Sequence, residues 1–550
     1  MMHYVCKYTP VELFAGFGEK YTVLDDMPDN FDLSDRIAHP NLCGFGKSVI
    51  QSALSKGIDK LVLVNCCDTM RRVYDIIKDS GTCSFLYMID LPHKCGYCQK
   101  EAFTESLLHL KSAYEKYTGK QFDRNAFKSA FPLLQRVSGP YVGILGARVG
   151  REIEAMIKKS IPFPVRNLTC IGNRSLSMDI NALENVPDEK QLFMIYADAL
   201  LSQLPCRRMN DSTARRCLYA DPNLRGVIYH TIKFCDYYGF EYSEIKDKLT
   251  VPILKLETDY TRQSEGQLQT RIEAFSETLS CLENKKAKKR SSIKEHFVAG
   301  IDSGSASTDI VIMDQNKNIV ASVITPTGGS AQSSAEKSLD EALHKAGIDR
   351  SSISRIVTTG YGRSYISGSD ESITEITCHA KGAHYLNPAV RTVIDIGGQD
   401  SKVIRIDETG AVRNFVMNDK CAAGTGRFLE MMARTLGLSL EEMSTLGLNW
   451  KEDIIITSMC TVFAESEVVS LVAQNKAVPD IIHGLNNSVA AKVSTLVNRL
   501  GLKEDFMMTG GVAKNTGVVH AIEDKLGIKL YICKEAQLCG ALGAALFALE

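Results

Sequence analysis

Two segments of this chain, about 90 residues apart, repeat one pattern: a strand that ends in aspartate, a turn of small residues and a returning strand. The first is FVAGIDSGSASTDIVIMD, residues 297–314, with Asp302 before the turn. The second is TVIDIGGQDSKVIRID, residues 392–407, with Asp395 near the strand end. Turns of small residues let backbone N–H groups approach phosphate oxygens, and an aspartate at a strand end suits a hydrated magnesium ion. Either hairpin alone is also typical of an ordinary turn, but the repetition indicates a phosphate site.

A third element, FMMTGGVAKNTGVVH at residues 506–520, is a strand followed by a Gly-Gly pair and a helix. The three elements, in this order, resemble the sugar-kinase/actin/heat-shock-chaperone superfamily, whose ATPase fold is duplicated. The resemblance implies that the hairpins bind the phosphates of ATP with magnesium and that the third element contacts the adenosine. A P-loop is excluded, because no G-x-x-x-x-G-K-[ST] motif is present.

This resemblance gives two sets of expected site residues. The catalytic set is Asp302, Asp395 and Gln399. The nucleotide-binding set is Ser303, Gly304, Ser305, Ser307, Thr308, Gly397, Gly398, Gly510, Gly511, Lys514 and Asn515.

The length and charge of the chain limit the number of domains and the kinds of partner that we expect. With 550 residues, two or three domains are expected. The formal net charge of -1 gives no electrostatic reason to expect a nucleic acid or an anionic membrane as partner. No apolar run reaches the roughly 18 residues that a membrane helix needs, and MMHYVCKYTPVEL at the start lacks the pattern of a signal peptide. We therefore expect a cytoplasmic protein.

A highly charged segment, residues 283–296, predicts a solvated linker, with a nucleic-acid patch as the alternative. Before it, apolar runs such as KLVLVN (60–65) and YVGILG (141–146) alternate with helical patterns, which favours parallel sheets covered by helices. A break near Ser138 divides this part of the chain. We expect α/β sub-domains at 1–140 and 141–282, and an ATPase domain at 297–550.

The chain contains 17 cysteines, and two of them each precede a predicted helix: Cys421 in MNDKCAAGTGRFLE and Cys460 in MCTVFAESEV. A helix N-terminus stabilises a thiolate and the anionic cluster that it would hold. Two cysteines cannot supply the four ligands of a 4Fe-4S cube, but two chains related by a two-fold axis can. A shared cluster therefore predicts a homodimer, and two buried structural cysteines are the alternative.

The stretches IDIGGQDSKVI, MNDKCAAGTGRFLE, MCTVFAESEV and MTGGVAKN closely resemble the activator ATPases of 2-hydroxyacyl-CoA dehydratases and the ATPase subunits of benzoyl-CoA reductases. The likeness covers essentially all of 297–550. It implies a homodimer with one 4Fe-4S cluster between the chains, held by Cys421 and Cys460 of each. It also implies that ATP binding and hydrolysis change the shape of the dimer and drive a low-potential electron onto a partner.

The first half resembles, more loosely, the dehydratase component of the same system, which has two Rossmann-like sub-domains. The similarity is carried by HPNLCGFGKS, NCCD, IDLPHK, HTIKFCDYY and LKLETDYTRQSEGQLQTRIEAF. It implies that Cys43, Cys67 and Cys235 hold a second iron–sulfur cluster.

Two features of the first half depart from that pattern. Cys66 stands directly before Cys67, so either is a candidate ligand, and Cys95-Gly-Tyr-Cys98 is an additional CxxC motif. Redox, cluster and structural roles are all open for this motif. The whole set is large enough for more than one cube, as in the double-cubane relatives of this family. Structural roles are expected for Cys6, Cys83, Cys170 and Cys281.

The expected function is an ATP-dependent, iron–sulfur electron-transfer activase fused to a dehydratase-like module. Its expected partners are an electron donor such as ferredoxin or flavodoxin and, unless the first half accepts the electron, a separate dehydratase or reductase component. One alternative is a complete ATP-driven reductase or dehydratase of an acyl-CoA or other small molecule. Another is a small-molecule kinase, which predicts a nucleotide site without iron and a phosphorylated product.

Overall fold

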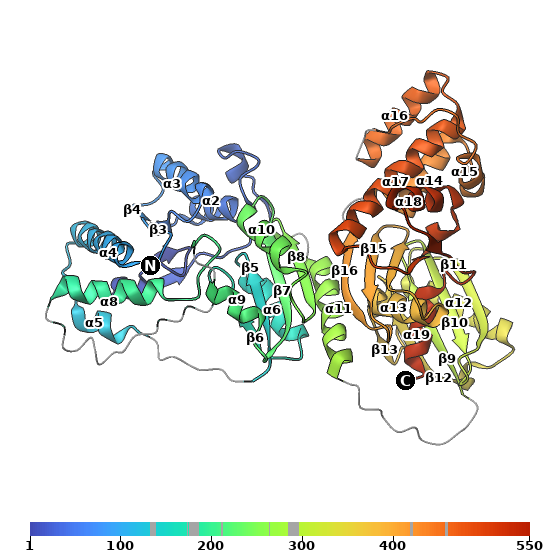
Figure 1. Cartoon of the computed structure of the whole chain (residues 1–550), viewed down its shortest axis with the longest axis horizontal. Coiled ribbons are helices and arrows are strands. Elements are labelled where there is room, and N and C mark those ends of the chain that lie inside the picture. The colour runs from blue at the N-terminus through green and yellow to red at the C-terminus, as the bar shows by residue number, and fades with distance from the viewer. Residues whose placement is uncertain are drawn as a thin grey trace. The chain divides into compact units, whose positions relative to one another are not determined.

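The computed structural model describes residues 1–131, 139–172, 174, 176, 186, 188–210, 213–262, 265–283, 296–418, 422–456 and 460–550. These residues form two compact units, Met1–Ile272 and Glu273–Glu550 (Figure 1). Helix α11 (Glu265–Glu283) spans the point of division. Only the first and last residues of the expected linker, 283–296, belong to the described part of the chain.

The first unit begins with a parallel sheet in the order β2-β1-β3-β4. Its strands are β1 (Met2–Tyr4), β2 (Tyr21–Val23), β3 (Lys60–Val64) and β4 (Phe85–Ile89). The helices along this part are α1 (Val11–Ala15), η1 (Ser34–Arg36), α2 (Gly44–Lys56), α3 (Asp68–Ser80), α4 (Tyr97–Thr118) and α5 (Arg124–Ser129). The apolar residues of β3 are buried on both faces, as expected for a parallel sheet covered by helices.

A second parallel sheet follows in the order β6-β5-β7-β8. Its strands are β5 (Tyr141–Gly146), β6 (Val165–Asn167), β7 (Leu224–Ile232) and β8 (Ile253–Thr258). The helices are α6 (Arg151–Ser160), α8 (Glu189–Leu201), α9 (Thr213–Tyr219) and α10 (Asp236–Ile245). Helix α8 packs against α4, and its apolar side chains join the core of the first sheet (Figure 1). Two parallel sheets in series confirm the predicted tandem Rossmann-like fold.

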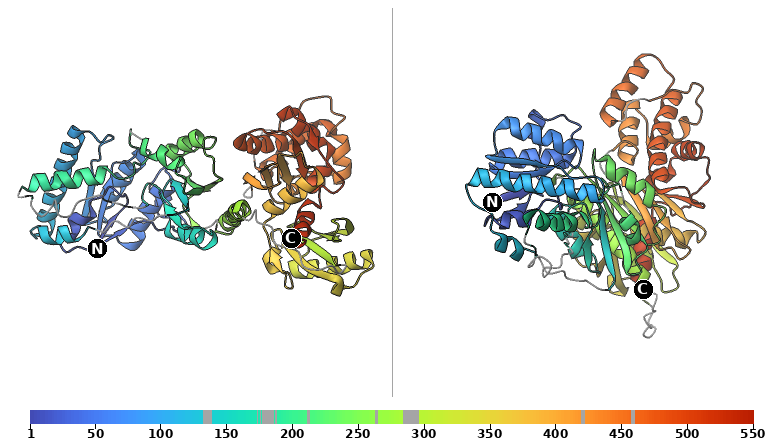
Figure 2. Two further views of the ribbon diagram at one scale, coloured as in Figure 1. Left: turned by 60° about the horizontal axis from the view of Figure 1, so that its bottom comes forward. Right: turned by 60° about the vertical axis from the view of Figure 1, so that its left-hand side comes forward.

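The second unit contains two five-stranded sheets with the same internal order. These orders are β11-β10-β9-β12-β13 and β16-β15-β14-β17-β18. In each sheet the first three strands along the chain are antiparallel, and the last two run parallel to the first. The repetition is the duplicated architecture of the actin-like ATPases and confirms the predicted fold. In the left view of Figure 2 the two sheets lie in separate lobes, one yellow and one orange to red.

The first lobe comprises β9 (Phe297–Ser303), β10 (Ser307–Met313), β11 (Ile319–Pro326), α12 (Ala331–Ala346), η3 (Arg350–Ser352), β12 (Ile353–Thr359), η4 (Arg363–Tyr365), β13 (Glu371–Ser372) and α13 (Glu375–Leu386). The second comprises β14 (Thr392–Ile396), β15 (Ser401–Ile406), β16 (Val412–Asn418), α14 (Gly426–Leu436), α15 (Leu440–Leu446), α16 (Thr461–Ala473), α17 (Val478–Leu500), β17 (Phe506–Thr509), η5 (Gly511–Lys514), α18 (Thr516–Leu526), β18 (Leu530–Tyr531) and α19 (Cys539–Ala548).

Helices α13 and α19 cross between the two lobes. Each follows the last strand of one sheet, yet α19 packs against β9, β10 and β12, while α13 contacts the second sheet. The helices approach so closely that a β-carbon at Gly382 would collide with the carbonyl oxygen of Cys539, and one at Gly543 with that of Cys378. This crossing brings the start of α13 beside the ends of β9 and β14, where both predicted aspartates lie.

Candidate functional site

A cavity of about 830 Å³ lies in the second unit, and all three predicted nucleotide elements contribute to its wall. The predicted residues that line it are Asp302, Gly304, Ser305, Ser307, Asp395, Gly397, Gly398, Gly510, Gly511, Lys514 and Asn515. Residues from opposite ends of a 250-residue segment are thus brought to one site, as the order of the motifs predicts.

Three predicted residues do not belong to the wall of this cavity. Ser303 and Thr308 are fully buried, and the hydroxyl of Thr308 lies 2.8 Å from that of Thr327. Gln399 is exposed at the turn of the second hairpin. A role for these three in binding or catalysis stays a prediction.

The glycine turns form a surface that a phosphate chain can approach closely. A β-carbon at Gly398 would lie 2.8 Å from the β-carbon of Ala306 and 3.3 Å from the Ser305 hydroxyl, so the two hairpin turns face each other at contact distance. Gly510 has a φ of +86°, and a β-carbon there would collide with the carbonyl oxygen of Ile396. These turns, together with the aliphatic side chains that also line the cavity, fit a nucleotide.

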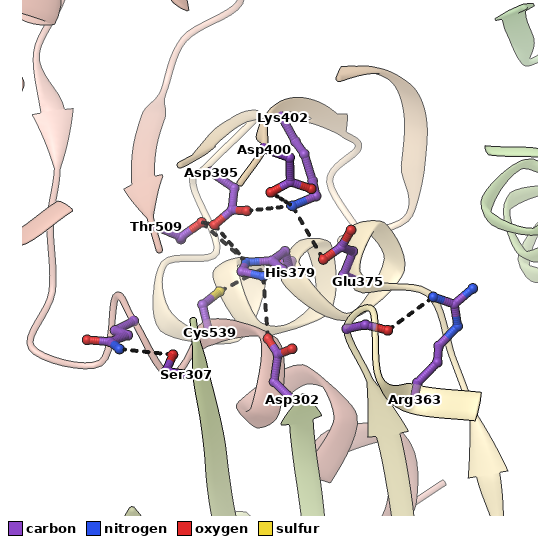
Figure 3. A network of polar contacts seen from close by, with 12 residues as sticks. Asp302, Ser307, Arg363, Glu375, His379, Asp395, Asp400, Lys402, Thr509 and Cys539 are labelled. Atoms are coloured by element: carbon purple, nitrogen blue, oxygen red, sulfur yellow. Dashed lines mark hydrogen bonds and ion pairs between the residues drawn. The ribbon is translucent and has the colours of Figure 1, made fainter. Parts of the chain in front are cut away.

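A buried lysine ties three acidic groups together beneath the turns (Figure 3). Lys402 Nζ lies 2.9 Å from Asp400 Oδ1, 3.1 Å from Asp395 Oδ2 and 3.4 Å from Glu375 Oε2. The lysine side chain is only 2% exposed, so these ion pairs have little solvent screening. Tyr361 also donates a hydrogen bond to Asp400 Oδ2, at 3.0 Å.

His379 stands between the two predicted catalytic aspartates (Figure 3). Its Nε2 lies 3.8 Å from Asp302 Oδ2, and its Nδ1 lies 3.4 Å from Asp395 Oδ1. Burial lowers the pKa of His379, so the imidazole is neutral. Burial opposes ionisation of Asp395 too, but Lys402 and a 2.9 Å hydrogen bond from Thr509 help to hold its pKa below the usual range.

The donor set fits a magnesium ion held by carboxylates and phosphates. Burial, reinforced by Asp309 and Asp395, raises the pKa of Asp302 to about 8, so without a cation this carboxyl is largely protonated at neutral pH. A divalent cation would reverse that balance and displace the proton. Asp302 and Asp395, which face the cavity from the two lobes, are the residues that would orient the ion and its water.

Every predicted cysteine ligand that the structure describes is the N-cap of a helix. Cys43 caps α2, Cys67 caps α3, Cys235 caps α10 and Cys460 caps α16. Cysteine is not a usual N-cap residue, and none of these four side chains caps the helix by a hydrogen bond. Backbone N–H groups of the first helical turn act on the sulfurs of Cys43, Cys67 and Cys235, and such groups favour a thiolate or an anionic cluster. Cys421 lies outside the described residues.

The three N-cap cysteines of the first unit are electrostatic neighbours. Cys43 and Cys67 both act on the thiol of Cys235, whose pKa is raised first of all by burial. A hydrogen bond from Cys66 lowers the pKa of Cys67 to about 7, which favours Cys67 over Cys66 as the thiolate. Among the described residues, no three His, Cys, Asp or Glu side chains form a group that could hold a metal ion. The ligands of a cluster bind different iron atoms, so they do not need that geometry.

The CxxC motif of the first unit lies at the surface. Cys95 and Cys98 are both exposed, and Gly96 between them is the N-cap of the long helix α4. The Cys95 thiol donates to the carbonyl oxygen of Leu201 at 3.5 Å. Redox, cluster and structural roles for the pair stay open.

The predicted site residues do not include the buried groups beneath the phosphate turns, Glu375, His379 and Lys402. Glu375 and His379 are spaced four residues apart and therefore share one face of α13. Lys402 is a charged residue directly before the apolar pair Val403 and Ile404 of β15, and a charge that is buried in a strand requires an ion partner. Both signals were present in the sequence, but neither indicates which partner the side chain meets.

Comparison with known proteins finds a different family for each half of the chain. Residues 299–548 match the BadF/BadG/BcrA/BcrD ATPase family. The activator of lactoyl-CoA dehydratase from Anaerotignum propionicum is 48% identical over 254 residues, which cover 46% of this chain and 98% of that protein. This protein belongs to the BadF/BadG/BcrA/BcrD ATPase family. The first half matches the D-component of 2-hydroxyglutaryl-CoA dehydratase, over residues 6–169 and 141–279.

Other relatives within this family carry related names. The (R)-2-hydroxyglutaryl-CoA dehydratase activating ATPase of Acidaminococcus fermentans is 45% identical over 46% of this chain and 97% of its own length. A benzoyl-CoA reductase chain of Thauera aromatica is 33% identical over 39% of this chain and 77% of its own length. The crystal structure of the A. fermentans dehydratase component A is 44% identical, covers 46% of this chain and 98% of that chain, and has a TM-score of 0.45.

The chain thus joins an ATPase of the dehydratase-activator type to a dehydratase-like module. Both parts of the predicted family resemblance are confirmed. Within the described residues, no helix is both long and apolar enough to cross a membrane.

Proposed function

We propose that this protein is an ATP-dependent iron–sulfur electron-transfer activase whose fused dehydratase-like half accepts the electron. The ATPase halves of two chains would share one 4Fe-4S cluster through Cys421 and Cys460 of each, and the first half would hold a second cluster through Cys43, Cys67 and Cys235. When bound, the clusters supply one-electron redox chemistry. The observation that carries the proposal is the helix N-cap position of all four of these cysteines that the structure describes.

A direct chain of contacts supports coupling between nucleotide and cluster. The first N–H groups of α14 donate to the phosphate turn: Gly426 to the Gly397 oxygen and Arg427 to the Gly398 oxygen, both at 2.9 Å. Helix α14 packs on α16, and the hydroxyl of Thr435 donates to Glu465 Oε1 at 3.1 Å. Cys460 caps α16, so the phosphate turn and a predicted cluster ligand are connected through two packed helices.

The exposed face of α16 supports a homodimer. Val462, Phe463 and Val469 are each more than half exposed, and they lie within ten residues of Cys460. A second copy that completes the ligand set of the cluster would also cover these apolar side chains.

The free energy of ATP hydrolysis is large enough to drive electron transfer. For one electron, about 59 mV corresponds to about 1.4 kcal/mol, and nucleotide hydrolysis releases several times that energy.

The cysteines support a reducing compartment. Among the residues whose side chains the structure describes, no disulfide is formed. Structural disulfides are usual in oxidising compartments and rare in the cytosol, so we place the protein in the cytoplasm. The electron donor would be a low-potential protein such as ferredoxin or flavodoxin.

The test is anaerobic purification of the full chain, with iron and sulfide analysis and EPR before and after addition of reductant and ATP. We expect two clusters with distinct signals and ATP-dependent reduction of the one in the first half. Serine at Cys43, Cys67 and Cys235 together should remove that cluster's iron and leave ATP hydrolysis intact. Full iron content in this triple variant would disprove the ligand assignment. A protein that lacks iron and phosphorylates a small molecule would instead be a kinase.

A further inference from the structure

Asp309 is an acidic residue of the nucleotide cavity that the predicted site does not include. It lies on β10 directly opposite Asp302 on β9, in the register Asp309↔Asp302 of the antiparallel pair. Side chains of directly opposed residues point to the same face of a sheet, with β-carbons about 5 Å apart. Both residues line the cavity. The phosphate hairpin therefore presents two carboxyl groups side by side.

One oxygen of Asp309 has no partner within the described residues. Asp309 is only 5% exposed, and its Oδ1 is buried without a hydrogen bond. A buried carboxyl oxygen in this condition is costly, because both water and a protein donor are missing. The side chain of Asp309 lines the cavity, so a group that binds there can supply the missing partner when the carboxyl turns toward it.

The charges around Asp309 decide what that group is. Lys514 also lines the cavity and acts electrostatically on Asp309, and Asp309 in turn acts on Asp302 with a like charge. The two carboxyl groups can be ionised together beside nucleotide phosphates only if a cation balances their charge. A divalent cation removes the conflict, because magnesium keeps several waters and binds through one or two carboxylates together with phosphate oxygens.

We propose that Asp309 is a positioning residue of the metal–nucleotide site, whose carboxylate accepts a hydrogen bond from a water of the magnesium ion that Asp302 and the phosphates hold. The inference rests on the nucleotide site of the proposed function and adds one residue to it. The simpler alternative is that Asp309 only holds Lys514 in place.

The two roles predict opposite patterns of nucleotide affinity. If Asp309 acts through the metal, Asp309→Asn weakens the binding of Mn²⁺–ADP by about tenfold or more, which is typical when a hydrogen-bond partner of a metal site is lost. Metal-free ADP should bind the same variant no more weakly than the wild type, because a carboxylate beside the phosphates has been removed. If Asp309 only holds Lys514, both affinities change together.

The experiment uses the full-length protein with ADP. Mn²⁺ binding is followed by the EPR signal of the free ion, and ADP binding in EDTA by calorimetry. Asp302→Asn serves as the positive control and should also lose metal-dependent affinity. Asp340→Asn is the matched negative control, since Asp340 is an exposed aspartate on α12 of the same lobe. It should leave both affinities unchanged.

Two further variants make the outcome decisive. In a Lys514→Gln background, Asp309→Asn should still cause the metal-specific loss; if the loss disappears there, Asp309 acts through Lys514 and the inference is wrong. Asp309→Ser should reproduce the effect of Asp309→Asn if the latter folds poorly. An equal affinity of wild type and Asp309→Asn for Mn²⁺–ADP overturns only this inference. Failure of the wild type to bind Mn²⁺–ADP would instead overturn the proposed nucleotide site.

Discussion

Replacing Lys402 with methionine should destabilise the ATPase half by about 3–5 kcal/mol, the usual effect of removing one partner from a buried ion pair. Methionine keeps most of the length of the side chain and removes its charge and its hydrogen-bond donors. Lys402 is 2% exposed and lies within 3.4 Å of three acidic side chains. Glu375 is largely protonated at neutral pH, because burial raises its pKa to about 8. The charges that lose their partner are therefore Asp395 and Asp400.

The loss should depend on pH in a defined direction. Lys402 helps to depress the pKa of Asp395 in the folded wild type. The Asp395 carboxylate therefore stabilises the fold at pH values above the pKa of aspartate in the unfolded chain, near 4. That contribution is lost as the pH falls through the pKa of Asp395 in the folded protein. Without the lysine, burial is opposed less strongly, and the folded pKa of Asp395 rises relative to the wild type. The variant should then be most destabilised at pH 8 and should recover part of the loss at pH 5.

Trp450 is the only tryptophan of the chain and lies in the second unit, so its fluorescence reports unfolding of the ATPase half alone. At about 3 kcal/mol per molar urea, the upper end of the usual range, the unfolding midpoint should fall by about 1 M or more. Lys381→Met is the matched control, because Lys381 pairs with Glu550 at the surface, where a salt bridge contributes about 0–1 kcal/mol. A midpoint shift no larger than that of the control, or equal shifts at pH 8 and pH 5, would refute this account.

Three other predictions address the proposed activity. Asp395→Asn should reduce magnesium-dependent ATP hydrolysis about a hundredfold at saturating nucleotide, as loss of one aligned polar group typically does. Its fluorescence-detected unfolding midpoint should fall less than that of Lys402→Met, because Lys402 keeps Asp400 as a partner. Gly398→Val should weaken ATP binding measured by calorimetry, because the valine side chain would meet Ser305 and Ala306 across the two turns. An unchanged affinity would contradict the assignment of these turns to the phosphate site. Cys460→Ser should remove iron from the ATPase half and lower the dimer fraction seen by analytical ultracentrifugation; full iron with an intact dimer would exclude Cys460 as a ligand.

Much of the ATPase fold was predictable, because its signals are local. The aspartate, turn and returning strand of each hairpin are contiguous, so Asp302 and Asp395 were placed at strand ends without knowledge of tertiary contacts. Cys460 was likewise placed at a helix start because the periodicity after it is helical.

The rest of the site depends on contacts between distant segments. His379 lies 130 residues from Thr509, and only the crossing of α13 and α19 brings it beside both aspartates. The ion pairs of Lys402 involve a helix that precedes its strand, which no local pattern indicates. Asp309 was visible in the first hairpin, but its unsatisfied oxygen is a property of packing and not of the motif.

The crossing of α13 and α19 restricts how the two lobes can move. At this contact Gly382 lies against the backbone of Cys539 and Gly543 against that of Cys378, so few side chains interlock between the two helices. Surfaces without side-chain knobs slide and pivot with few rotamer changes, whereas separation would strip each sheet of the helix that covers it. Nucleotide-driven motion in this ATPase should therefore be a rotation of one lobe about the crossing point. The displacement of a residue should increase with its distance from that point and so be large at α16.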